Sequence, residues 1–271
     1  MNPVSKNIQQ QYQGYIDTPL LWKDHTVLGL EQLLLPALET PNFNDTIPDN
    51  LLLGKRVERF VVSELEQIQS IEILLQNKQV QNKKITIGEI DCVLKQEGIP
   101  IHLEIVYKFY LYDPAIGSSE IEHWIGPNRK DTLFKKLTKL KDKQLPLIYN
   151  EHTEQILHNL TLKADKILQR ILFKAQLFTP YQQNVEFNLL NQACLNGFYV
   201  YQSDMQQFST CKFYIPKKVD WLLEVQAEVD WLDFNQFQEN IDALLIDKKA
   251  PLCWIKFPNG ELQKFFVVWW N

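Results

Sequence analysis

The 271-residue sequence lacks any apolar run that approaches the roughly 18 residues needed to cross a bilayer. Its first residues, MNPVSKN, also lack the apolar stretch of a signal peptide. We therefore expect a cytoplasmic protein with no membrane segment. The nine glycines form no glycine-rich phosphate loop, and there is no internal repeat or low-complexity tract. With 45% hydrophobic residues, the chain is long enough to bury one large core or two ordinary ones.

Cysteine and histidine are also sparse. Cys92, Cys194, Cys211 and Cys253 lie far apart and form no C-x-x-C pair, so neither a zinc knuckle nor a dense disulfide framework is indicated. We expect reduced and mostly buried thiols. None of the five histidines forms a metal-ligand pair at helical i, i+4 spacing, which favours ordinary core or surface roles for them.

Acidic residues outnumber basic residues overall, but the basic residues are concentrated in one segment. The net charge of -5 argues against a protein that coats nucleic acid through its whole surface. Residues 129–143, however, hold seven basic and two acidic residues. Such a run on a helix is usually a solvated surface, but beside a phosphodiester-cleaving core it is a candidate phosphate clamp. The candidate nucleic-acid contacts are Arg129, Lys135, Lys136 and Lys139.

Acids and a lysine stand among apolar neighbours in two adjacent segments that we predict to be strands. Residues 88–94 read GEIDCVL, and residues 102–111 read HLEIVYKFYL. A half-buried strand normally turns apolar side chains toward the core. A carboxylate that points inward must therefore be neutralised by a cation, a metal or hydrogen bonds.

The alternation of side chains along a strand groups these residues by face. Glu89 and Asp91 share one face, and Glu104 and Lys108 share a face of the next strand. The short polar connection at residues 95–100 suits an antiparallel hairpin. The pattern allows carboxylates and an ammonium group to converge, an arrangement that suits Mg²⁺ or Mn²⁺ and phosphodiester hydrolysis.

This spacing resembles the PD-(D/E)XK nuclease-like superfamily, in which an Asp on one strand precedes a (D/E)-x-K motif on the next. A longer series of motifs resembles DUF1853, a bacterial family of unknown function placed in that superfamily. The motifs are LGKRVE at 53–58, GEID at 88–91, HLEIVYKFYL at 102–111 and WIGPN at 124–128. The likeness covers residues 50–145 at the level of motifs and extends more loosely to both ends.

The resemblance implies a set of site residues. Asp91, Glu104 and the main-chain carbonyl of Ile105 would bind Mg²⁺ or Mn²⁺. Glu58, on the first helix of the core, or Glu89 would support a second metal or hydrogen-bond the metal ligands. An exposed helix pair between Glu58 and Lys55 is the simpler alternative for Glu58.

The lysine departs from the usual pattern. The superfamily motif places it at position 106, where this chain has Val106. Lys108 lies two residues further along the same face, about 6.6 Å by strand rise, and its flexible stem can reach back. We interpret it as a shifted lysine that positions the attacking water. The departure leaves open an inactive relative that keeps the fold.

Two functions therefore remain in view. The first is a divalent-metal-dependent nuclease acting on DNA or RNA. The second is a catalytically inactive nuclease-like binding or scaffolding protein. A cross-strand Glu–Lys pair without any chemistry is the plain alternative to both.

The predicted fold is α/β, with a restriction-endonuclease-like core whose mixed central sheet is flanked by helices. The predicted parts are an N-terminal helical cover at 1–50, the core at 51–180 and a C-terminal α+β extension at 181–271. The aromatic C-terminal region is a candidate surface for a protein partner or a second copy.

The individual elements follow from apolar periodicity and turn signals. The predicted helices are 28–36, 51–69, 129–143, 151–170 and 234–245. The predicted strands are 71–75, 85–94, 101–111, 171–178, 198–202 and 212–215, with a hairpin at 252–270 around Asn259-Gly260.

Overall fold

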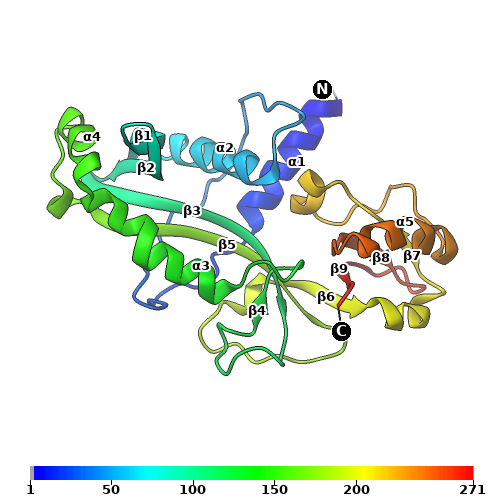
Figure 1. Cartoon of the computed structure of the whole chain (residues 1–271). Helices are drawn as coiled ribbons and strands as arrows, with labels where there is room; N and C mark the ends of the chain where they lie inside the picture. Colours follow the sequence, from blue (N-terminus) through cyan, green and yellow to red (C-terminus); the bar gives the residue numbers. More distant parts are fainter. Residues whose placement is uncertain (1–2, 271) are drawn as a thin grey trace. The chain divides into compact units, whose positions relative to one another are not determined.

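The computed structural model (Figure 1) describes residues 3–270, and these form two compact units. The first unit holds the chain up to Pro19, Lys108–Phe134 and the chain from Ala175 onward. The second unit holds Leu20–Tyr107 and Lys135–Lys174. Two long strands contribute residues to both units.

The second unit is built on consecutive antiparallel hairpins. β1 (Ile71–Asn82) pairs with β2 (Ile85–Gln96), and β2 pairs with β3 (Ile99–Tyr112). The turn between β2 and β3 consists of Glu97 and Gly98, which both have positive φ, as a two-residue hairpin turn requires. β5 (Leu168–Pro180) is the next strand after β3. The predicted strands are confirmed, and β1 extends well beyond its predicted end.

The helices of this unit are short, apart from α2. α2 (Leu53–Glu66) buries Val57, Phe60 and Leu65 and lies beside β1 (Figure 1). α3 (Leu133–Lys139) begins at the end of the first unit and continues here as a π-helix, η1 (Leu140–Gln144). The remaining helical segments are η2 (Leu145–Tyr149), η3 (Glu151–Thr153), α4 (Glu154–Asn159) and η4 (Ala164–Lys166).

The first unit holds the mixed part of the sheet. β5 and β6 (Leu195–Tyr201) are parallel, as are β6 and β9 (Leu262–Val268). β8 (Leu252–Lys256) and β7 (Lys212–Tyr214) follow as antiparallel neighbours. Its other elements are α1 (Pro3–Asp17), β4 (Trp124–Ile125), η5 (Gln192–Cys194), η6 (Gln202–Phe208), η7 (Lys218–Leu222) and α5 (Phe234–Ile246).

Aromatic side chains fill the core of the first unit. Phe213, Phe237 and Phe265 pack together between α5 and the strands. Trp254 and Trp270 are also buried. These aromatics stabilise the unit by burial. A partner or second copy at the C-terminal region stays a prediction.

Three predicted helices differ from the structure. The predicted helix at 28–36 is wrong: the main-chain N–H of Leu33 donates to the carbonyl of Ile171, so this leucine-rich segment runs along β5. The predicted helix at 129–143 starts later, at Leu133, because Arg129 takes a positive φ in a turn. The predicted helix at 151–170 ends at Asn159, just before Thr161, which also has positive φ. Tertiary pairing and turns overrode local propensity.

The coarser predictions hold. The fold is α/β, with a mixed sheet flanked by helices. All four cysteines are free and buried. Across residues 3–270, no helix is both long enough and apolar enough to cross a membrane. The domain limits at residues 50 and 180 stay a prediction.

Candidate metal and catalytic site

Glu104 of β3 is a fully buried carboxylate held from both sides. Its Oε1 lies 3.2 Å from Nε2 of His102, which is also fully buried. Its Oε2 accepts a hydrogen bond from the side-chain amide of Gln144, at the end of η1. A buried carboxylate requires such partners because its desolvation is costly. The predicted metal ligand is thus fixed in orientation.

Asp91 of β2 completes a pair of neighbouring acids. Its Oδ2 accepts a hydrogen bond from the main-chain N–H of Ile105 at 2.9 Å. Burial, followed by the charge of Glu104, raises the pKa of Asp91 to about 7, although the bond from Ile105 opposes the shift. Two carboxylates that destabilise each other's charge are characteristic of sites that bind a cation or a proton.

The sheet register places polar residues of three strands in one row. Cys92 pairs with Leu103, so one more step of the β2–β3 register brings Asp91 level with Glu104. On the other side, Gln76 pairs with Cys92 and Lys78 with Ile90, which leaves Asn77 level with Asp91. Asn77 has a φ of 47°, a left-handed conformation that Asn tolerates better than most residues. The row therefore runs Asn77, Asp91, Glu104.

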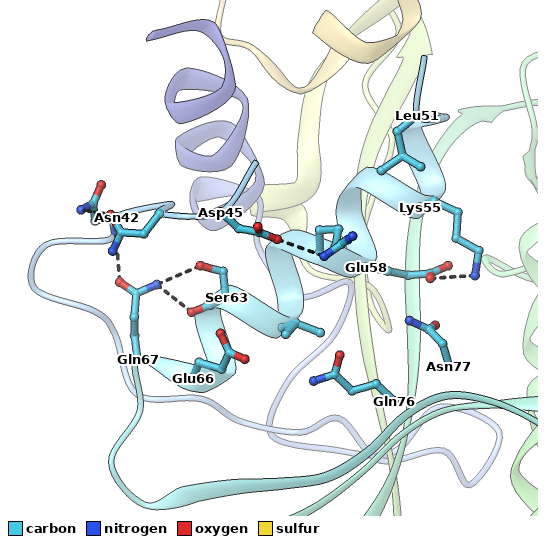
Figure 2. Close-up of a pocket in the computed structure, with 13 residues that line it drawn as sticks. Asn42, Asp45, Leu51, Lys55, Glu58, Ser63, Glu66, Gln67, Gln76 and Asn77 are labelled. Carbon is cyan, nitrogen blue, oxygen red and sulfur yellow. Dashed lines mark hydrogen bonds and ion pairs between the residues drawn. The ribbon is translucent and has the colours of Figure 1, made fainter. Parts of the chain in front are cut away.

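Lys55 gathers the two auxiliary acids. Its Nζ lies 2.7 Å from Glu58 and 3.1 Å from Glu89 (the pair with Glu58 is drawn in Figure 2). Burial lowers the pKa of Lys55, but its hydrogen bonds to Glu58 and Glu89 outweigh this effect and raise it overall. The charge of Glu58 also raises the pKa of Asp91. Glu58 therefore forms the helix pair with Lys55 and still acts electrostatically on the site.

Lys136 of α3 is linked to Glu104 through the side-chain amide of Gln144. Nζ of Lys136 donates to Oε1 of Gln144 at 2.9 Å, and Gln144 in turn donates to Glu104. The positive charge of Lys136 opposes the rise in the pKa of Asp91 that burial and Glu104 cause. A π-helix turn, a feature often found at functional sites, separates Lys136 from Gln144.

Lys108 belongs to the first unit, where its Nζ pairs with Asp131 at 2.7 Å. Its role as the water-positioning lysine stays a prediction. Arg129 pairs with Asp113 at 2.9 Å and stacks on Trp270 at 4.6 Å, so much of its side chain serves the packing of that unit. Lys135 and Lys139 are exposed on α3. Their contacts with nucleic acid also stay predictions.

The acids fit a hard divalent cation by their chemistry. Within the described residues, Asp91 forms no side-chain hydrogen bond other than the one to Ile105, so its carboxylate can accept another ligand. No group of three or more His, Cys, Asp or Glu side chains in the described chain is arranged to hold a metal. Asp91 and Glu104 would therefore need a main-chain donor, such as the carbonyl of Ile105, and water.

Sequence reasoning missed His102 and Gln144 as partners of Glu104. His102 lies two residues before Glu104 on the same strand face, so the period of two could have identified it. Gln144 is 40 residues away on an irregular helix, and no local pattern points to it. Nδ1 of His102 is buried without a hydrogen-bond partner in the described structure, so the ring meets Glu104 through Nε2.

Replacing Gln144 by leucine is expected to lower the free energy of unfolding by about 1 to 3 kcal/mol, because Glu104 would lose a buried donor. Gln155→Leu is the matched control, since Gln155 is an exposed amide that bonds Asn159 on α4. Urea denaturation measures both variants. Equal stability of Gln144→Leu and the wild type would contradict a supporting role for this amide.

Comparison with known proteins places most of the chain in one family. A family model described as "Domain of unknown function (DUF1853)" matches residues 8–268. No curated protein and no solved structure matched the chain. The match spans both units and every residue of the candidate site.

Proposed function

The chain belongs to the DUF1853 family, and from that premise we propose that it is a divalent-metal-dependent nuclease that hydrolyses phosphodiester bonds in DNA or RNA. The observation that carries this proposal is the acid pair: Glu104 is fully buried, and burial, together with the charge of Glu104, raises the pKa of the adjacent Asp91. A purely structural core gains little from two such carboxylates, whereas a cation offsets their repulsion.

The proposal includes a restriction-endonuclease-like core for this region. Three features support it: antiparallel strands β1, β2 and β3, a helix α2 before them, and acids on adjacent strands. The acids lie where the β2–β3 ladder ends, at Cys92 and Leu103. This arrangement agrees with the motif resemblance, in which an Asp on one strand precedes a Glu on the next.

Each residue of the site has a distinct task in this proposal. A bound Mg²⁺ or Mn²⁺ polarises the phosphodiester and lowers the pKa of a bound water. Asp91 and Glu104 would hold the ion, with the Ile105 carbonyl as a further donor. His102 and Gln144 fix the orientation of Glu104 through its two oxygens.

Cations near the acids stabilise the negative charge that develops on phosphate during hydrolysis. Lys136 supplies such a charge to this unit, because its ammonium group already acts on Asp91. Lys108 remains the proposed water-positioning lysine. Glu58, held by Lys55, adds negative charge on the α2 side and supports a second ion or the hydrogen bonds of the ligands.

Labelled single- and double-stranded DNA and RNA test the activity directly. The wild type is expected to cut at least one of these substrates with Mg²⁺ or Mn²⁺ and none with a chelator. Asp91→Asn is expected to abolish cleavage, because it removes a charged ligand. Asp165→Asn is the control, since Asp165 is an exposed acid that pairs with Lys166. Cleavage that persists in Asp91→Asn, or in chelator, would refute the proposal.

A noncatalytic binding or scaffolding protein is the second candidate. One observation favours it: both oxygens of Glu104 already have protein partners, so the site is satisfied without an ion. Such a protein would bind nucleic acid or a partner without cleavage. Its melting temperature would not respond to Mg²⁺ or Mn²⁺, whereas a metal site is stabilised by its ligand.

A further inference from the structure

A polar groove of about 840 Å³ runs between α2 and β1 in the second unit (Figure 2). This volume lies within the roughly 300 to 1,000 Å³ that holds a small organic ligand. α2 provides one wall, the strand β1 provides the floor, and the loop before α2 provides the rim. Five side-chain amides line the groove: Asn42, Asn44, Gln67, Gln76 and Asn77.

One end of the groove borders the acid pair. Lys55 and Glu58 line this end, and Glu58 acts electrostatically on Asp91. Asn77, on the floor, lies level with Asp91 in the β1–β2 register. Asp91 itself does not line the groove, but a molecule at this end would lie beside Glu58 and Asn77, the two groove residues related to Asp91.

The groove is suited to a neutral polar ligand. Asp45, Glu58 and Glu66 line it against only Lys55 and Arg59, so its net charge is negative and it disfavours phosphate. Asp45 forms an ion pair with Arg59 at 3.0 Å, so these two charges largely offset each other. No aromatic side chain lines the groove for stacking. Recognition must therefore come from hydrogen bonds.

The amides on the floor are available for those bonds. The side chains of Gln76 and Asn77 are exposed and form no hydrogen bond with any described residue. Figure 2 shows both on the side of β1 that faces α2. An Asn or Gln amide carries a donor and an acceptor side by side, which matches the edge of a nucleobase.

We propose that this groove binds the edge of an unpaired nucleobase next to the scissile phosphate, through Gln76 and Asn77. The inference rests on the proposed nuclease function and names its substrate class as single-stranded nucleic acid, because a base must leave its stack and its pair before it can enter a concave groove. The phosphates remain outside, where the ion and Lys136 act on them.

The test compares cleavage of single strands that carry either a base or an abasic site next to the cut. The wild type is expected to prefer the base-containing strand by about tenfold in kcat/KM, as one amide–base pair provides. Combined replacement by Gln76→Ala and Asn77→Gly should raise KM and remove this preference, with kcat little changed. Glycine suits the positive φ of Asn77.

Gln81→Ala is the matched control, because Gln81 is an exposed amide on the same strand but outside the groove. It should keep the preference of the wild type. An unchanged preference in the double variant would overturn the groove while leaving the nuclease intact. A drop in kcat that is equal for base-containing and abasic strands would also overturn it. A wild type that cuts no strand would overturn both proposals.

Discussion

Replacing Glu104 by glutamine is expected to lower metal-dependent cleavage by about a thousandfold or more, since loss of a charged ligand costs several kcal/mol and 1.36 kcal/mol is tenfold in rate. The fold should survive. Glutamine has nearly the same shape, and its amide oxygen can still accept a hydrogen bond from His102 or Gln144. Steady-state cleavage with Mg²⁺ and with Mn²⁺ measures the loss, and circular dichroism verifies the fold.

The matched control is Glu72→Gln. Glu72 lies on β1 in the same unit, is largely exposed and pairs with Lys95 at 3.3 Å. It should retain full activity and the full metal-induced rise in melting temperature, whereas Glu104→Gln should lose both. Cleavage by Glu104→Gln at the rate of the control would show that the buried acid has no part in catalysis.

The stability of the metal-free protein is expected to fall as the pH rises from about 4 to 7, with Asp91 as a cause. The pKa of this carboxyl is 3.8 in the reference state and about 7 in the folded chain. The folded state therefore holds the proton more tightly, so stability is full at low pH and declines as Asp91 ionises. At 1.36 kcal/mol per pKa unit, and reduced because Asp91 is partly exposed, the loss is roughly 2 kcal/mol.

Two additions separate Asp91 from other titrating groups. Asp91→Asn should remove this part of the pH dependence and raise the melting temperature at pH 8 without metal. Mg²⁺ or Mn²⁺ should stabilise the wild type more at pH 8 than at pH 5, because protons compete with the ion for the carboxylate. Identical pH profiles for the wild type and Asp91→Asn would contradict a raised pKa.

The strands and the acids on them were predictable from local pattern. The alternation in 88–94 and 102–111 gives β2, β3 and their shared hairpin, because the period of two in a strand survives most tertiary contexts. The row from Asp91 to Glu104 follows from this register. The C-terminal hairpin at Asn259-Gly260 is also confirmed, because the conformation of a tight turn depends on its own residues.

The features that the sequence did not predict depend on contacts between distant segments. The leucine-rich stretch at 28–38 has helical spacing, yet its main chain pairs with β5, some 140 residues later. The contact between Gln144 and Glu104 depends on a π-helix whose extra residue resets the helical phase. The bridge from Lys55 to Glu89 joins a helix to a strand across 34 residues. None of these has a periodic signature.

The hydrogen bond from Ile105 to Asp91 gives this aspartate a second, structural role, because it links β3 to β2. The main-chain pairing of β2 and β3 stops after Cys92 and Leu103, and beyond this point the Asp91 side chain bonds to the main chain of β3. Truncation of Asp91 to alanine would therefore remove a hydrogen bond between β2 and β3 as well as a charge. Asparagine keeps an oxygen in the same place, so Asp91→Asn removes the charge while it keeps the hydrogen bond from Ile105.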